Sequence, residues 1–164
     1  MKIDDDGEQS VYAVEPEPAW LPELLGLHPL LADADRKTVA DWHRPPFRDP
    51  TWEPLDEEAL ERQRGWQLAH PLPLYLRVAE LARVLVQSWD QFDDDARRNI
   101  FCYLEEILCA GQKACNDQDV LHMRMSMFET MHNLAEQAGE PRLREMWRYL
   151  GVESEKRMSE MGKP

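Results

Sequence analysis

Few residues in this chain are of types that could support chemistry, and the first candidates are a glutamate and a histidine three residues apart. Glu129 and His132 form a Glu-x-x-His step, which di-iron helical bundles place on each of two helices. The chain carries one copy of this step and no second copy. We therefore expect His132 to lie at a half-buried edge of a helix, and we predict no metal ion and no other cofactor.

The three cysteines are the next candidates. Cys109, Cys115 and His122 do not have the spacing of a structural zinc site, in which paired ligands lie two to five residues apart. Cys102 and Cys109 are seven residues apart in a predicted helix, about 10 Å along its axis, which is too far for a disulfide. No base accompanies a cysteine, and no hydrolase, P-loop or dinucleotide motif is present. The sequence therefore predicts a protein that is not an enzyme.

An acidic turn between Asp90 and Asp95 has some features of a calcium loop. It lacks the glycine at the sixth position, and Phe101 stands where such a loop has its bidentate glutamate. Helix capping explains these aspartates better, because Asp93 or Asp94 can accept a hydrogen bond from the first turn of a helix that continues to about Ala110.

Several predicted helices must position these residues, and the strongest helical pattern lies between Leu74 and Trp89. Its apolar residues recur at steps of three and four and cover most of the helix, so other elements must pack around it. Strand signals are absent. The other predicted helices begin at Asp33 or Asp35, Asp56, Asp93 or Asp94, Asn116 or Asp117, and Glu140, and end near Trp42, Ala69, Ala110, Gly139 and Leu150. We therefore predict an all-α, single-domain bundle of four to six helices.

The two ends of the chain differ from this helical core, which we place at residues 74–152. Residues 1–18 are acidic and predicted to form an extended arm. Residues 19–73 are rich in proline, which limits helix length, and we expect this irregular segment to wrap on the bundle. Residues 153–164 are polar, and we expect them to fray.

The charge of the chain restricts its partners. Lys and Arg number 19 against 32 Asp and Glu, which gives a net charge of -13. Residues 1–73 carry -9 of this and residues 74–164 carry -4. Such an excess argues against nucleic acid or an anionic membrane as a ligand and favours a basic partner. No signal peptide or transmembrane run is evident, so we expect a cytoplasmic protein.

One segment resembles a known kind of protein. In residues 94–133, ARRNIFCYLEEILCAG precedes NDQDVLHMRMSMFETMHNL, with a Phe-Glu-x-x-x-Asn step at Phe128, Glu129 and Asn133. This segment is similar to small all-helical bacterial immunity proteins encoded beside secreted toxins. The resemblance implies a cytosolic protein that neutralises a cognate toxin by occluding its active site.

Two functional hypotheses follow from these patterns. The first is such an immunity protein, acting on a toxin with a basic cleft. We predict that it binds through acidic residues and aromatic anchors of the first half of the chain: Asp4, Asp5, Asp6, Tyr12, Glu15, Glu17, Trp20, Trp52, Glu53, Glu57 and Glu58.

The second hypothesis is an adaptor, secretion chaperone or regulatory subunit that holds a partner helix in a groove of methionine and leucine. This hypothesis requires Met123, Met127 and Met131 to be exposed, whereas the first expects them to be buried.

Overall fold

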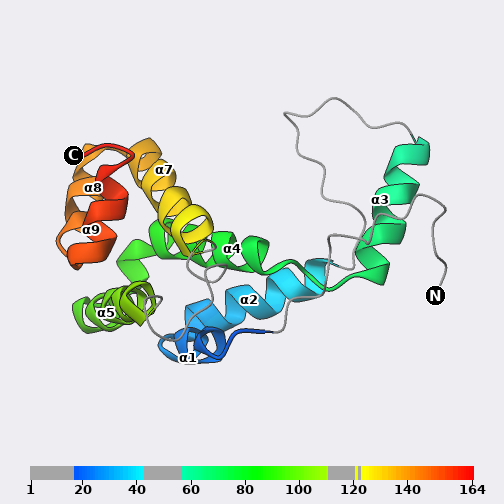
Figure 1. Ribbon diagram of the computed structural model, residues 1–164, viewed down its shortest axis with the longest axis horizontal. Coiled ribbons are helices and arrows are strands. Elements are labelled where there is room, and N and C mark those ends of the chain that lie inside the picture. The colour runs from blue at the N-terminus through cyan, green and yellow to red at the C-terminus, as the bar shows by residue number, and fades with distance from the viewer. Residues whose placement is uncertain (1–16, 43–56, 111–120, 122) are drawn as a thin grey trace.

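The computed structural model describes residues 17–42, 57–110, 121 and 123–164, and all regular structure within these ranges is helical (Figure 1). The all-α prediction is therefore confirmed for this part of the chain. The described residues form eight α-helices, so the predicted number of four to six is too low. The helices are α1 (Trp20–Gly26), α2 (Pro29–Trp42), α3 (Glu57–Ala69), α4 (Leu74–Gln87), α5 (Asp94–Ala110), α7 (Glu129–Ala138), α8 (Glu140–Trp147) and α9 (Val152–Ser159). A 3-10 turn, η1 (Trp89–Gln91), and a π-helical turn, η2 (Met123–Phe128), join them.

Helix α4 is the centre of the bundle, as its sequence predicts. It crosses the middle of the molecule, with α2 packed on it from one side and η2 and α7 from another (Figure 1). Val78, Leu81 and Leu85 are buried along it, and burial of each such side chain contributes about 2 kcal/mol. The apolar stripe does not extend to Tyr75, which is 49% exposed near the start of the helix.

Helix α1 was not predicted from the sequence. It is seven residues long and has Pro22 in its first turn, where the missing N–H is tolerated. Leu21 and Leu24 are fully buried, so packing stabilises a helix that would be too short to persist alone.

Helix α2 begins earlier than predicted. His28 Nδ1 accepts a hydrogen bond from the N–H of Leu30 at 3.3 Å, and Pro29 is the first helical residue. The prediction that Asp33 or Asp35 caps this helix is wrong, because both lie inside it. The carboxylate of Asp35 instead forms a salt bridge with Arg77 of α4.

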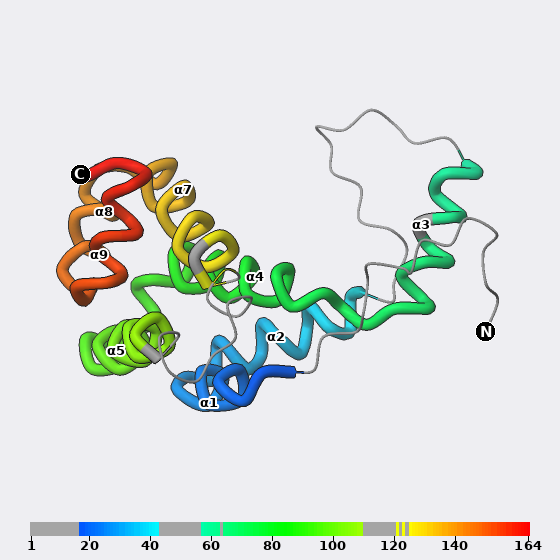
Figure 2. The backbone as a smooth tube through the Cα atoms, in the orientation of Figure 1, coloured from blue at the N-terminus to red at the C-terminus, as the bar shows by residue number. Residues whose placement is uncertain are grey.

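Helix α3 lies outside the bundle, beyond the C-terminal end of α2 and the N-terminal end of α4 (Figure 2). The prediction of an irregular, wrapped first half is therefore not confirmed in the described ranges, where α1 and α2 are regular and α3 projects away. The expected cap at Asp56 lies outside the described residues, as does residue range 1–16.

Helix α5 follows the acidic turn and confirms the predicted cap. Asp93 Oδ1 accepts a hydrogen bond from the N–H of Ala96 at 2.8 Å. Ile100, Leu104 and Ile107 are buried on the predicted stripe. The capping role therefore accounts for Asp93 without a calcium ion.

The C-terminal part differs from the sequence expectation in two places. The helix predicted from Asn116 or Asp117 to Gly139 contains the π turn η2 before α7, and its expected start lies outside the described residues. The prediction that residues 153–164 fray is wrong, because α9 forms and Met158 is fully buried. Two methionines, Met158 and Met161, on an otherwise polar segment gave too little periodicity to reveal this helix.

Candidate interaction surfaces

Of the eleven predicted binding residues, four lie in the described ranges: Glu17, Trp20, Glu57 and Glu58. Glu57 and Glu58 are exposed in the first turn of α3, and Glu58 pairs with Arg62 at 2.7 Å. Trp20 is only 7% exposed and belongs to the core, so it cannot serve as a surface anchor as predicted. The other predicted residues lie outside the described ranges: Asp4, Asp5, Asp6, Tyr12, Glu15, Trp52 and Glu53.

Glu17 takes part in an ion-pair network that the sequence did not reveal. Arg77 Nη1 donates to Glu17 Oε2 at 2.7 Å, while Arg77 Nε and Nη2 donate to the two carboxylate oxygens of Asp35, each at 2.7 Å. The hydrogen bonds that Arg77 donates to Asp35, and the one that it donates to Glu17, raise the pKa of Arg77, although partial burial opposes the rise. The Glu17 carboxylate is half exposed and its charge is shared with Arg77.

A second set of charged groups links η1 and the start of α5 to α8 and to Tyr149, which follows it. Arg142 donates through both Nη atoms to the carboxylate of Asp90, at 3.2 and 3.1 Å. These hydrogen bonds and the charge of Arg142 lower the pKa of Asp90. The hydroxyl of Tyr149 donates to Asp94 Oδ1 at 2.6 Å, and this bond, together with one from Arg98, lowers the pKa of Asp94.

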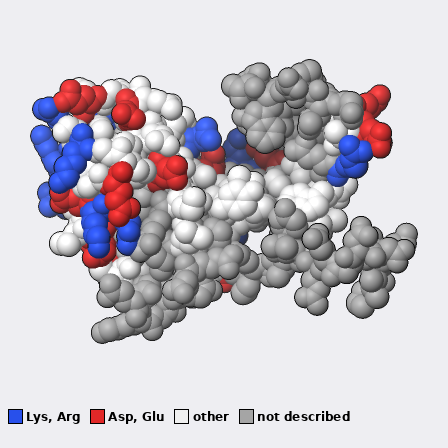
Figure 3. Space-filling view, turned by 45° about the horizontal axis from the view of Figure 1, so that its top comes forward, with Lys and Arg blue, Asp and Glu red and all other residues white. Residues whose placement is uncertain are grey.

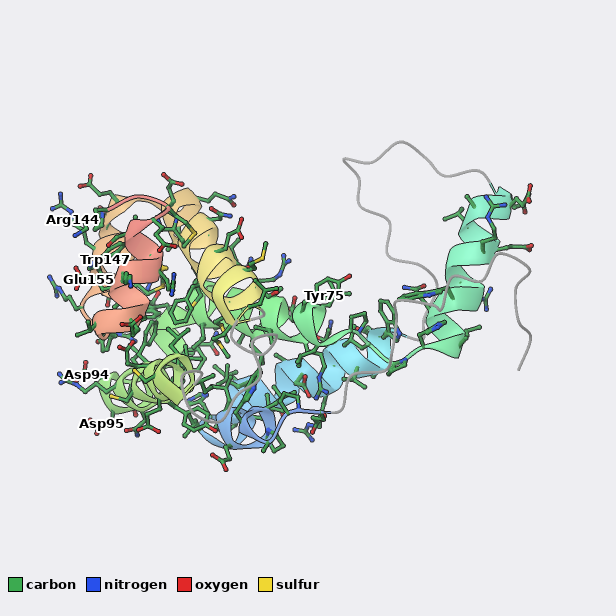
Figure 4. The ribbon with its side chains drawn as sticks, viewed as in Figure 1. Tyr75, Asp94, Asp95, Arg144, Trp147 and Glu155 are labelled. Atoms are coloured by element: carbon green, nitrogen blue, oxygen red, sulfur yellow. The ribbon has the colours of Figure 1, made fainter. Side chains whose placement is uncertain are left out.

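This end of the molecule does not form a surface of one sign. Acidic and basic side chains alternate over it in the space-filling view, whereas the described surface in the centre is mostly uncharged (Figure 3). Asp94 and Asp95 of α5 lie at the same end as Arg144, Trp147 and Glu155 of α8 and α9 (Figure 4). Residues 140–164 contain five acids and six bases, so a basic partner gains little attraction there.

His132, one of the candidates for chemistry, has a structural partner. His132 is buried, and its Nε2 lies 3.0 Å from the carbonyl oxygen of Gly162, so the predicted half-buried edge is instead an interior position. Among the described residues, no group of three or more His, Cys, Asp or Glu side chains could hold a metal ion.

Cys102 and Cys109 are free and exposed on α5. Partial loss of hydration and the charges of Glu105 and Glu153 raise the pKa of the Cys109 thiol. A raised pKa keeps the thiol protonated at neutral pH and lowers its reactivity. Cys115 and the side chain of His122 lie outside the described structure.

The methionines of η2 and α7 differ in their exposure to solvent. Met123, Met127 and Met131 are fully buried, whereas Met125 is 56% exposed. Exposed apolar side chains also occur at Leu121 and at Tyr75, which lies on α4 between the bundle and α3 (Figure 4). The exposure that a methionine groove would require at Met123, Met127 and Met131 is therefore absent.

The attachment of α3 rests on aromatic residues near its C-terminal end. Trp42 Nε1 of α2 donates to the carbonyl oxygen of His70 at 2.8 Å, and its ring meets the ring of Trp66 edge-on at 5.8 Å. The Trp66 ring stacks on the ring of His70 at 4.6 Å. These contacts leave the first turn of α3, with Glu57 and Glu58, away from the bundle (Figure 2).

Comparisons of the chain with protein-family models, curated proteins and solved structures found no match. No described helix is both long enough and apolar enough to cross a membrane.

Proposed function

We propose that this chain is a non-enzymatic, cytoplasmic interaction protein that binds a bacterial toxin with a basic active-site cleft and neutralises it by occlusion. The observation that carries the proposal is the excess of acid, a net charge of -13 with -9 in residues 1–73. Toxins that attack nucleic acid need basic clefts, and an acidic protein both speeds encounter with such a cleft and occupies the place of the phosphates.

The distribution of charge supports binding through the first half of the chain. Residues 140–164 carry a slight excess of base, so residues 1–139 carry a net charge of -14. Residues 140–164 therefore add no attraction for a basic partner, and the largest share of the negative charge, -9, lies in residues 1–73. On α3, Glu57 and Glu58 are exposed and stand clear of the bundle, where a cleft can reach them.

The burial of the methionines favours this proposal over an adaptor with a methionine groove. Such a groove would need Met123, Met127 and Met131 at the surface, but all three are fully buried. Their thioethers fill space between helices, which is the role that a flexible apolar side chain commonly has in a core.

The proposal can be tested with the full chain and the protein encoded next to its gene. We expect a complex at nanomolar concentration in moderate salt. Asp4→Asn, Asp5→Asn and Asp6→Asn together should slow association about tenfold at low salt, because they remove three negative charges from the proposed binding side.

A matched control removes the same charge elsewhere. Asp95→Asn, Glu106→Gln and Glu136→Gln together neutralise three exposed acids of α5 and α7, and we expect association to slow less than about twofold. Absence of a complex, or equal slowing by the two triple variants, would contradict the proposed binding side.

A further inference from the structure

One carboxylate of the bundle holds the start of the C-terminal helix α9. Glu105 of α5 accepts hydrogen bonds from the first turn of α9, Oε1 from the N–H of Glu153 at 2.7 Å and Oε2 from the N–H of Ser154 at 2.9 Å. These N–H groups have no partner within their own helix. Glu105 is therefore the cap of a helix to which it does not belong.

Gly151 makes this cap possible. A Cβ atom at this position would lie 2.4 Å from Cδ of Glu105 and 2.6 Å from its Cγ, closer than van der Waals contact permits. Any other residue would push the carboxylate away from α9. The φ angle of Gly151 is -83°, so the requirement concerns space and not backbone conformation.

Apart from the cap, few buried side chains attach α9 to the bundle. Met158 and Ser154 are its buried residues, and α9 packs against α5 and η2. The following segment is held where the Gly162 carbonyl oxygen meets His132 Nε2 at 3.0 Å. Gly162 has φ of +136°, which a residue with a side chain rarely adopts.

We propose that residues 152–162 form a latch that opens as a unit while the rest of the bundle stays folded. The latch is short, and it is held by the Glu105 cap, by the buried residues Ser154 and Met158 where α9 packs on α5 and η2, and by the Gly162 carbonyl contact. By contrast, α4 is buried on several sides and contacts α2, η2 and α7. Segments with few buried contacts open locally at lower free energy than the core. Opening uncovers the faces of α5 and η2 that α9 covers.

Amide hydrogen exchange of the full chain, followed by mass spectrometry at neutral pH, tests this proposal. In the unaltered protein, we expect amides of residues 155–161 to exchange at least about tenfold faster than those of residues 78–86 in α4. Glu105→Gln and Gly151→Ala each weaken the cap, so each should accelerate exchange in residues 155–161 by about a further tenfold. Exchange in α4 should change less than about twofold.

Two matched controls separate the latch from general destabilisation. Glu106→Gln removes the same charge one residue further along α5, and Gly26→Ala adds a methyl group where no described atom lies within 4 Å. Neither should alter exchange in residues 155–161. Equal exchange of α9 and α4 in the unaltered protein would overturn the proposal. It would also be overturned if the cap variants left α9 unchanged or accelerated both helices equally.

Discussion

Asp35 and Arg77 form a buried ion pair between α2 and α4, with only 7% of the Asp35 side chain and 16% of the Arg77 side chain exposed. Two parallel hydrogen bonds of 2.7 Å satisfy both carboxylate oxygens, which is the strongest geometry available to this pair. Burial makes the charges interdependent. Loss of Arg77 leaves Asp35 uncompensated away from water, and loss of Asp35 leaves Arg77 paired with the half-exposed Glu17 alone.

We expect Asp35→Ala to lower the free energy of unfolding by about 3 kcal/mol, because Arg77 would keep its charge in a site with little water. Urea denaturation measures this change. Asp33→Ala provides the control, since Asp33 lies on the same helix and pairs with Arg36 at the surface; it should cost less than about 1 kcal/mol. Equal losses in the two variants would show that the buried pair has no special role.

Sequence periodicity could not reveal these residue-level partners. Asp35 and Arg77 are 42 positions apart, and neither the spacing nor the type of either residue indicates the other. The same holds for Glu105, whose role depends on the absence of a side chain at Gly151. By contrast, the cap at Asp93 was predictable because its partner lies three residues away.

At the scale of elements, two ionised aspartates link η1 and the start of α5 to α8 and to Tyr149, which follows it. The pKa values of Asp90 and Asp94 are lowered from the ordinary 3.8 by Arg142 and by Tyr149 with Arg98. A carboxyl group whose pKa falls on folding contributes stability that is present at neutral pH and is lost as the pH falls below 3.8 and through the lowered pKa.

We therefore expect the urea midpoint of unfolding to fall between neutral pH and about pH 3, and to fall less in the double variant Asp90→Asn and Asp94→Asn. Asp95→Asn is the control, because Asp95 lies in the same first turn of α5. It should leave the pH dependence as it is in the unaltered protein. An unchanged acid dependence in the double variant would contradict the assignment.

The attachment of α3 gives a prediction of its own. Trp42→Ala removes the contacts with Trp66 and His70, so trypsin cleavage after Arg62 and Arg64 should accelerate about fivefold while cleavage after Arg83 in α4 stays slow. Trp42→Phe keeps a ring and should have a smaller effect. If cleavage after Arg83 accelerated equally, α3 would belong to the same cooperative unit as the bundle.

Elements with repeated apolar steps were predictable, and so was the short helix α8, which Pro141 and the apolar residues Leu143, Met146 and Trp147 indicate, whereas α1 and α9 were not. The patterns of α4 and α5 repeat over several turns and indicated both helices with their buried faces. Helices α1 and α9 are seven and eight residues long, so each gives too few repeats for its period to be recognised. Their stability comes from contacts with distant elements, which periodicity within one segment does not contain.

At the scale of the whole molecule, the proposed function depends both on the shape of the molecule and on its charge. The bundle around α4 has an end where acids and bases alternate, and α3 projects from the opposite side (Figures 1 and 3). The all-helical class was predictable from composition and periodicity. The projection of α3 was not, because it depends on two contacts of Trp42, one with the ring of Trp66 and one with the carbonyl oxygen of His70.

The most direct test of the proposed function is the association rate of the full chain with its neighbouring gene product at increasing salt. An acidic protein that meets a basic cleft should associate about tenfold more slowly at 500 mM than at 50 mM salt, because salt screens the attraction that brings the two together. An association rate that is insensitive to salt, or that rises with salt, would contradict a basic partner.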